Sequence, residues 1–117
     1  MLAAQLDSLA EMVVGLPVKQ RQQLMNKAES YRKVLDKAIA SILAPSIGRA
    51  DDQFLVADAV IPLYGMGPTP QEAMEDYRSV VVEYYESLEA EAGELAPSLR
   101  NQLDILRQVI EPLEKVV

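Results

Sequence analysis

The sequence of 117 residues contains no cysteine and no histidine. These two absences exclude disulfide bonds, thiol nucleophiles, serine–histidine catalytic pairs and zinc sites built on Cys or His ligands. Imidazole is also missing as a general acid or base. Because no other catalytic constellation is present, we expect a protein that is not an enzyme and that needs no cofactor or metal.

Aromatic residues and long apolar runs are scarce as well. Half of the residues are apolar, but tryptophan is absent and the aromatic residues are one phenylalanine and five tyrosines. The core must therefore consist mainly of aliphatic side chains. No apolar run approaches the ~18 residues of a membrane span, and no basic leader precedes a short apolar segment, so we expect a cytoplasmic protein.

The net charge of −7 is unevenly distributed along the chain. Between residues 17 and 43 there are six basic and two acidic residues, a balance of +4, and between 69 and 95 there are eight acidic residues and one arginine, a balance of −7. Two helices of opposite sign are most simply partners, within a subunit or across a dimer. The alternative is a solvated face on each helix, because exposed ion pairs contribute only about 0–1 kcal/mol.

Apolar spacings of three and four predict a short helix over 2–14 and a long one over 17–43. At about 1.5 Å per residue the second helix is ~40 Å long. It could pair with another copy or another protein, or it could lie over the C-terminal half of its own chain. Its apolar seam has heptad spacing and consists of Leu24, Ala28, Tyr31, Leu35, Ala38 and Ile42.

Residues 54–61 are apolar and rich in β-branched side chains, which predicts a buried strand. A strand needs a ladder partner, yet 46–53 reads as a polar connector and residues 65–67 as a glycine turn. The partner is then the same strand from another subunit, or a short piece of the connector. We expect a homodimer held by this strand and the long helix, through Leu24, Tyr31, Leu35, Phe54, Val56 and Val60.

A strong helix-start signal follows the glycine turn. Thr69 can cap the helix, Pro70 stands where a missing N–H costs least, and Glu72 completes a capping box. The apolar pattern then predicts one helix from Pro70 to about Glu91 and another from Pro97. The expected fold is mainly α, with four helices and one strand in a single domain over 1–117. Its two parts are an N-terminal helical part over 1–45 and a strand with two helices over 52–115.

The segment from Pro62 to Leu88 resembles a known family. Pro62, Gly67, Thr69 and the pair Glu72-Ala73 are similar to the pattern Pro…Gly-x-Thr-x-x-Glu-Ala of the HicB-like antitoxins, over about a quarter of the chain. In that family the segment joins a sheet strand to the first helix of a small α/β domain. The resemblance implies an antitoxin that binds and neutralises a small RNA-cleaving toxin, usually dimerises and usually represses its own operon.

We therefore expect a protein–protein interaction module that resembles an antitoxin. RNA-cleaving toxins are expected to be basic, so the acidic helix is the favoured surface for such a partner. On this helix Glu75, Glu83 and Glu86 would steer the partner and Tyr85 would be a packed anchor.

Two other functions remain open at this point. One is a nucleic-acid-binding regulator that uses the basic helix 17–43, through Lys19, Arg21, Lys27 and Arg32. The acidic helix and the negative net charge make nucleic acid the less favoured partner. The other is a stand-alone structural protein without a toxin.

Overall fold

The computed structural model describes residues 18–114, and their side chains from residue 28 onward. The helix expected over 2–14 therefore lies outside the described residues. The elements are, in chain order, α2 (Val18–Ile42), β1 (Pro45–Ala50), β2 (Gln53–Asp58), β3 (Tyr64–Gly67), α3 (Pro70–Ala90) and α4 (Pro97–Glu114).

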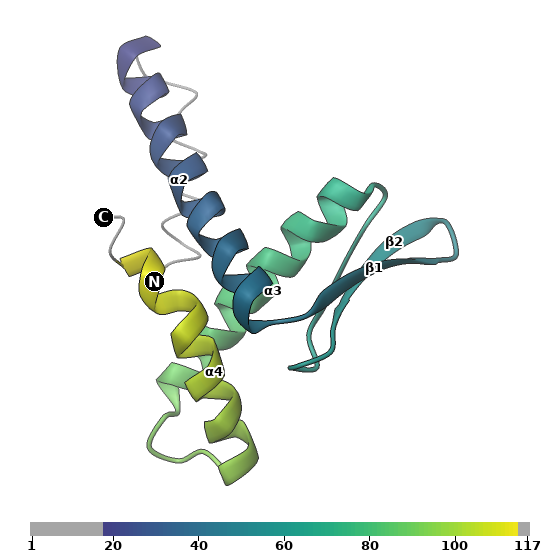
Figure 1. Cartoon of the computed structure of the whole chain (residues 1–117), viewed down its shortest axis with the longest axis vertical. Coiled ribbons are helices and arrows are strands. Elements are labelled where there is room, and N and C mark those ends of the chain that lie inside the picture. The colour runs from purple at the N-terminus through teal and green to yellow at the C-terminus, as the bar shows by residue number, and fades with distance from the viewer. Residues whose placement is uncertain (1–17, 115–117) are drawn as a thin grey trace.

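The fold is a three-stranded antiparallel sheet combined with three helices in the part of the chain that is described. Figure 1 shows the β1–β2 hairpin extending to one side, with α2 and α4 on the other side of α3. The helices expected over 17–43, from Pro70 and from Pro97 are confirmed. The expected mainly α fold of four helices and one strand is wrong, because two further strands flank the predicted one.

Strand β1 occupies the segment that the sequence predicted to be a polar connector. Most of its side chains are exposed, so it lacks the apolar alternation that marks a strand in sequence. It pairs with β2 across a two-residue loop of Asp51 and Asp52, and Asp51 has a φ of 58°. Aspartate tolerates this left-handed conformation better than most residues, which suits it to a tight hairpin loop.

Strand β2 lies in the middle of the sheet, with β1 on one edge and β3 on the other. Both of its edges are therefore occupied within the chain. The expectation that the strand over 54–61 pairs across a dimer is wrong for this reason. On one side it pairs with β1, which lies largely in the segment 46–53 that was predicted to be a connector. Pairing with this segment was the second possibility that the sequence left open.

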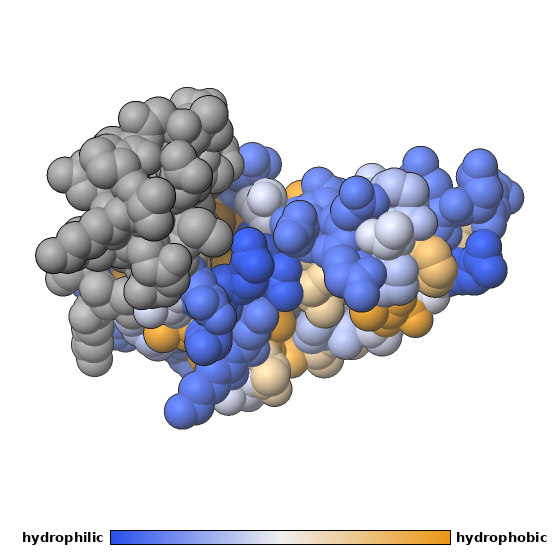
Figure 2. Space-filling view, turned by 90° about the horizontal axis from the view of Figure 1, so that it is seen from above, coloured by the Kyte–Doolittle hydropathy of each residue, from blue (hydrophilic) through white to orange (hydrophobic). Residues whose placement is uncertain are grey.

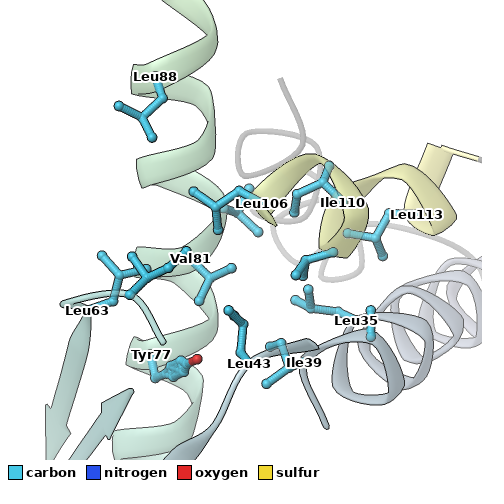
Figure 3. Packing of buried hydrophobic residues seen from close by; sticks show 14 of the residues in the cluster. Leu35, Ile39, Leu43, Leu63, Tyr77, Val81, Leu88, Leu106, Ile110 and Leu113 are labelled. Carbon is cyan, nitrogen blue, oxygen red and sulfur yellow. The ribbon is translucent and has the colours of Figure 1, made fainter. Parts of the chain in front are cut away.

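The hydrophobic core lies between α3 and the other two helices and continues under the sheet. Figure 3 shows Leu35 and Ile39 of α2 and Ile110 and Leu113 of α4 pointing into the same cluster. Tyr31 and Leu35 of the heptad seam are each only 2% exposed. At these two residues the seam is buried within its own chain, and α2 packs against the C-terminal helix α4.

The Asp58 carboxylate forms hydrogen bonds with three parts of the fold. One carboxylate oxygen, Oδ1, accepts hydrogen bonds from the N–H groups of Val60, Ile61 and Ala44, at 2.7, 3.3 and 3.4 Å. The other oxygen, Oδ2, accepts the hydroxyl of Tyr77 on α3. The end of α2, the turn after β2 and the buried face of α3 therefore meet at one side chain.

Candidate partner-binding surface

Strand β3 lies directly against α3 because two of its four residues are glycines. A Cβ added at Gly65 would come within 2.3 Å of the Tyr77 N atom, and one at Gly67 within 2.7 Å of the Ala73 N atom. Neither glycine has a positive φ. The segment that read as a glycine turn is therefore a strand whose glycines allow a close approach of the helix backbone.

The turn into α3 agrees with its sequence signal. The Thr69 hydroxyl accepts the N–H of Glu72 at 3.1 Å, and Pro70 begins the helix. This half of the predicted capping box is confirmed. The cap fixes where α3 starts, and so fixes which of its residues lie beside β3.

The two faces of the sheet differ because side chains alternate along each strand. Gly65 and Gly67 face α3, so Tyr64 and Met66 point to the opposite face. Their side chains are 61% and 39% exposed. Opposite them on β2 are Ala57, which is exposed, and Leu55, which is half-buried. We call this group of four residues, Leu55, Ala57, Tyr64 and Met66, the open sheet face.

The open sheet face is an apolar surface within a largely hydrophilic one. Figure 2 shows hydrophobic residues at the surface between hydrophilic ones on the half of the molecule that carries the hairpin. Tyrosine and methionine are enriched where proteins bind other proteins. The sequence feature that could have revealed this surface is the alternation of a large residue with glycine from Tyr64 to Gly67, because this alternation has the period of a strand.

The outer side of α3 carries a stripe of carboxylates, at positions that fall on one face of the helix. Glu72, Glu75 and Glu83 are exposed, and the structure gives none of them an ion pair with another described residue. Glu86 is half-buried and has a contact of its own. We call this group, Glu72, Glu75, Asp76, Glu83 and Glu86, the acidic stripe.

One hydrogen bond joins the acidic stripe to the open sheet face. Asp76 Oδ2 accepts the backbone N–H of Met66 at 2.9 Å. This N–H lies at the outer edge of β3, because Met66 is not one of the residues that bond to β2. Through Asp76 the acidic stripe therefore reaches the edge of the strand whose Tyr64 and Met66 side chains are exposed on the other face.

The predicted partner-binding residues do not all lie together. Glu75, Glu83 and Glu86 share one side of α3, whereas Tyr85 is half-buried against the core beside α4. Burial raises the pKa of Tyr85, and the nearby carboxylates of Glu89 and Glu114 raise it further. Tyr85 thus packs toward the core and α4, and of the acidic stripe only Glu86 contributes to the raised pKa of Tyr85.

The predicted dimerisation residues are mostly parts of the chain's own core. Tyr31 and Leu35 are buried, Val56 is fully buried in the middle strand, and Phe54 is half-buried. Val60 is 45% exposed in the turn after β2. The side chain of Leu24 lies outside the described part of the chain.

The basic helix keeps several cations at the surface. Arg32, Lys33 and Lys37 are exposed, and Lys33 forms an ion pair of 3.4 Å with Glu29. The side chains of Lys19, Arg21 and Lys27 lie outside the described residues.

The described residues contain no group of three or more metal-ligating side chains, and none of their helices is long and apolar enough to cross a membrane. Comparison with protein-family models, with curated proteins and with solved structures gives no match to this chain.

Proposed function

We propose that this protein is a protein-binding module that acts as an antitoxin, and that it neutralises a small basic RNA-cleaving toxin in the cytoplasm. The observation that carries the proposal is the hydrogen bond between Asp76 and Met66, which joins one carboxylate of the acidic stripe to the edge strand of the open sheet face. The whole acidic stripe and half of the open sheet face belong to residues 62–88, the segment that resembles the HicB-like antitoxins.

The proposed surface has the two parts that a protein interface needs. The exposed Tyr64 and Met66 side chains supply apolar area at its centre. The acidic stripe supplies a negative rim, which attracts a basic partner and speeds its association. A basic toxin that binds here would also have its RNA-binding cations covered by carboxylates, and this explains how binding would prevent RNA cleavage.

The test is to capture the partner and then to ask whether it cleaves RNA. Tagged protein is incubated with lysate of the source organism, and retained proteins are identified by mass spectrometry. A small basic protein that cleaves RNA by itself, and that stops cleaving when this protein is added, would support the proposal. Recovery of no such protein, or of one whose cleavage is unaffected, would contradict it.

A charge-reversed pair and a matched control locate the binding surface. Glu75→Lys with Glu83→Lys should weaken binding of the captured toxin by about tenfold or more, mainly through slower association. Glu94→Lys with Glu111→Lys changes the net charge by the same amount at exposed residues away from β3. Equal losses in both pairs would remove the acidic stripe from the proposal.

A further inference from the structure

The outer edge of β1 presents backbone groups that have no partner in the described chain. The Ala59 N–H bonds to the Ala44 carbonyl at 3.2 Å, which sets the alternation of the β1–β2 ladder. Ser46, Gly48 and Ala50 therefore bond to β2. The N–H and carbonyl groups of Ile47 and Arg49 point away from the sheet.

The two edges of the sheet differ in the groups that lie beside their outward backbone N–H and carbonyl groups. At β3 the Asp76 carboxylate accepts the outward N–H of Met66, which satisfies one backbone donor of that edge. At β1 the charged side chain that could guard the edge is turned away, because the Arg49 guanidinium lies 5.1 Å from the centre of the Phe54 ring. Ile47 is 51% exposed beside it. The edge of β1 is thus both unpaired and accessible.

We propose that β1 pairs in antiparallel fashion with β1 of a second copy, with the two-fold axis at Gly48, so that two sheets become one of six strands. In this register Ile47 of each copy lies opposite Arg49 of the other. Each such pair exchanges two hydrogen bonds, and the dimer gains four. All the outward backbone groups of Ile47 and Arg49 are then satisfied.

The length of this edge favours a second copy over a foreign strand. Only two residues offer outward donors, since Pro45 has no N–H and the hairpin loop begins at Asp51. A longer strand from another protein would meet Pro45 without a donor at one end and the loop at the other. The symmetric pairing needs neither position, and the two copies of Gly48 meet without side chains.

The pairing would also extend the open sheet face. Gly48 lies opposite Leu55, and Leu55 lies opposite Met66, so these three residues form a row across the sheet. A two-fold axis at Gly48 makes this row continuous through both copies. The dimer would then carry two partner-binding surfaces related by symmetry. The pairing of the two β1 strands does not itself depend on the proposed toxin.

The dimer should be weak. A six-residue edge buries far less than the roughly 1,600 Å² of a standard protein interface. We therefore expect self-association that increases with concentration. The difference in self-association between the unmodified protein and a variant whose β1 edge cannot pair should still be measurable.

Single cysteines test the register directly, because the natural chain has none. In an antiparallel pair without hydrogen bonds the Cα atoms are about 4.5 Å apart, a distance that a disulfide can span. A Cβ at Gly48 meets no other atom within 4 Å, so Gly48→Cys should fold and cross-link to itself under oxidation. Ser46→Cys is the control, since residues 46 of the two copies would be about 13 Å apart along the strand.

We expect Gly48→Cys to form covalent dimers at least about tenfold faster than Ser46→Cys, in the absence of any other protein. Equal rates would overturn the proposal. Because no toxin is present, this outcome is separate from the outcome of the antitoxin test.

A second experiment tests the edge without cysteine. Ile47→Pro removes an N–H that makes no bond to β2, so the hairpin should remain while dimerisation in analytical ultracentrifugation is lost. Ile47→Val, the control, should keep the dimer. In the unmodified protein, the amides of Ile47 and Arg49 should exchange with deuterium more slowly as concentration rises. Unchanged exchange, or an Ile47→Pro variant that dimerises normally, would overturn the proposal.

Discussion

Asp36 of α2 and Arg78 of α3 form an ion pair with two hydrogen bonds. Arg78 Nε donates to Asp36 Oδ1 at 2.6 Å, and Nη2 donates to Oδ2 at 3.1 Å. The sequence predicted that the basic and acidic helices are partners. This pair instead joins an acidic residue of the basic helix to the single cation of the acidic helix.

Loss of this pair should lower stability measurably, because its geometry is bidentate and the Arg78 side chain is only 20% exposed. We expect Arg78→Met to lower the free energy of unfolding by about 1 kcal/mol in urea titrations. The matched control is Lys33→Met, which breaks an ion pair with Glu29 that is largely exposed at both ends. The control should change stability by less than about 0.5 kcal/mol, and a loss as large as that of Arg78→Met would contradict the assignment.

Gly65 should be intolerant of even one added methyl group. In Gly65→Ala the new Cβ would meet backbone atoms of Tyr77 and Ala73 at 2.3–2.7 Å, so α3 would have to move from β3. We expect a loss of about 3 kcal/mol or more, seen as a lower melting temperature in circular dichroism. Gly48→Ala, at an open position of β1, should stay within about 0.5 kcal/mol of the unmodified protein. Similar melting temperatures for the two variants would refute the close approach of β3 to α3.

The buried bond between Tyr77 and Asp58 should make stability depend on pH in the alkaline range. Burial, and then the hydrogen bond and charge of Asp58, raise the pKa of Tyr77 above its ordinary value of about 10. In the unfolded chain the phenol loses its proton above that value, whereas in the folded chain it keeps it. The stability that Tyr77 contributes is therefore fully present below pH 10 and is lost as the pH rises further.

The measurement compares the unmodified protein with Tyr77→Phe, which cannot ionise at this position. From urea titrations between pH 7 and 11, we expect the unmodified protein to lose stability above about pH 10 relative to the variant. The variant retains Tyr85 and the other tyrosines, so their titration cancels in the difference. A difference that stays constant with pH would show that the raised pKa does not contribute to stability.

The open sheet face should matter for binding and not for folding. Tyr64→Ser with Met66→Ser removes two exposed apolar side chains, so the melting temperature should change little. Affinity for a captured toxin should fall by about tenfold or more, measured by titration calorimetry. As a control, Val60→Ser removes an exposed apolar side chain from the turn after β2 and should leave the affinity unchanged. Unchanged affinity in the double variant would exclude the open sheet face as the binding surface.

The helices could be predicted because their signals are local. The cap at Thr69, the prolines at positions 70 and 97 and the spacing of apolar residues act within a few turns of the chain. Each of these features stabilises or ends a helix whatever the rest of the molecule does. The predicted starts of α3 and α4 are therefore correct.

Two of the three strands could not be predicted because their evidence is not local. β1 has few buried side chains, and only its ladder with β2 makes it a strand. In β3, Gly65 and Gly67 suit a turn as well as a strand, and the decision comes from the helix that lies against them. A strand of this kind becomes stable through its neighbours, and sequence periodicity does not report those neighbours.

The same division applies to the candidate surface. The sequence by itself determined the helices, the carboxylates along α3 and the absence of thiol and imidazole chemistry, because these depend on residue type and short spacing. Only the tertiary structure decided that Tyr85 lies against α4 while Tyr64 and Met66 stay exposed beside Asp76. That outcome depends on which face of a sheet a helix covers, and packing between distant segments sets this.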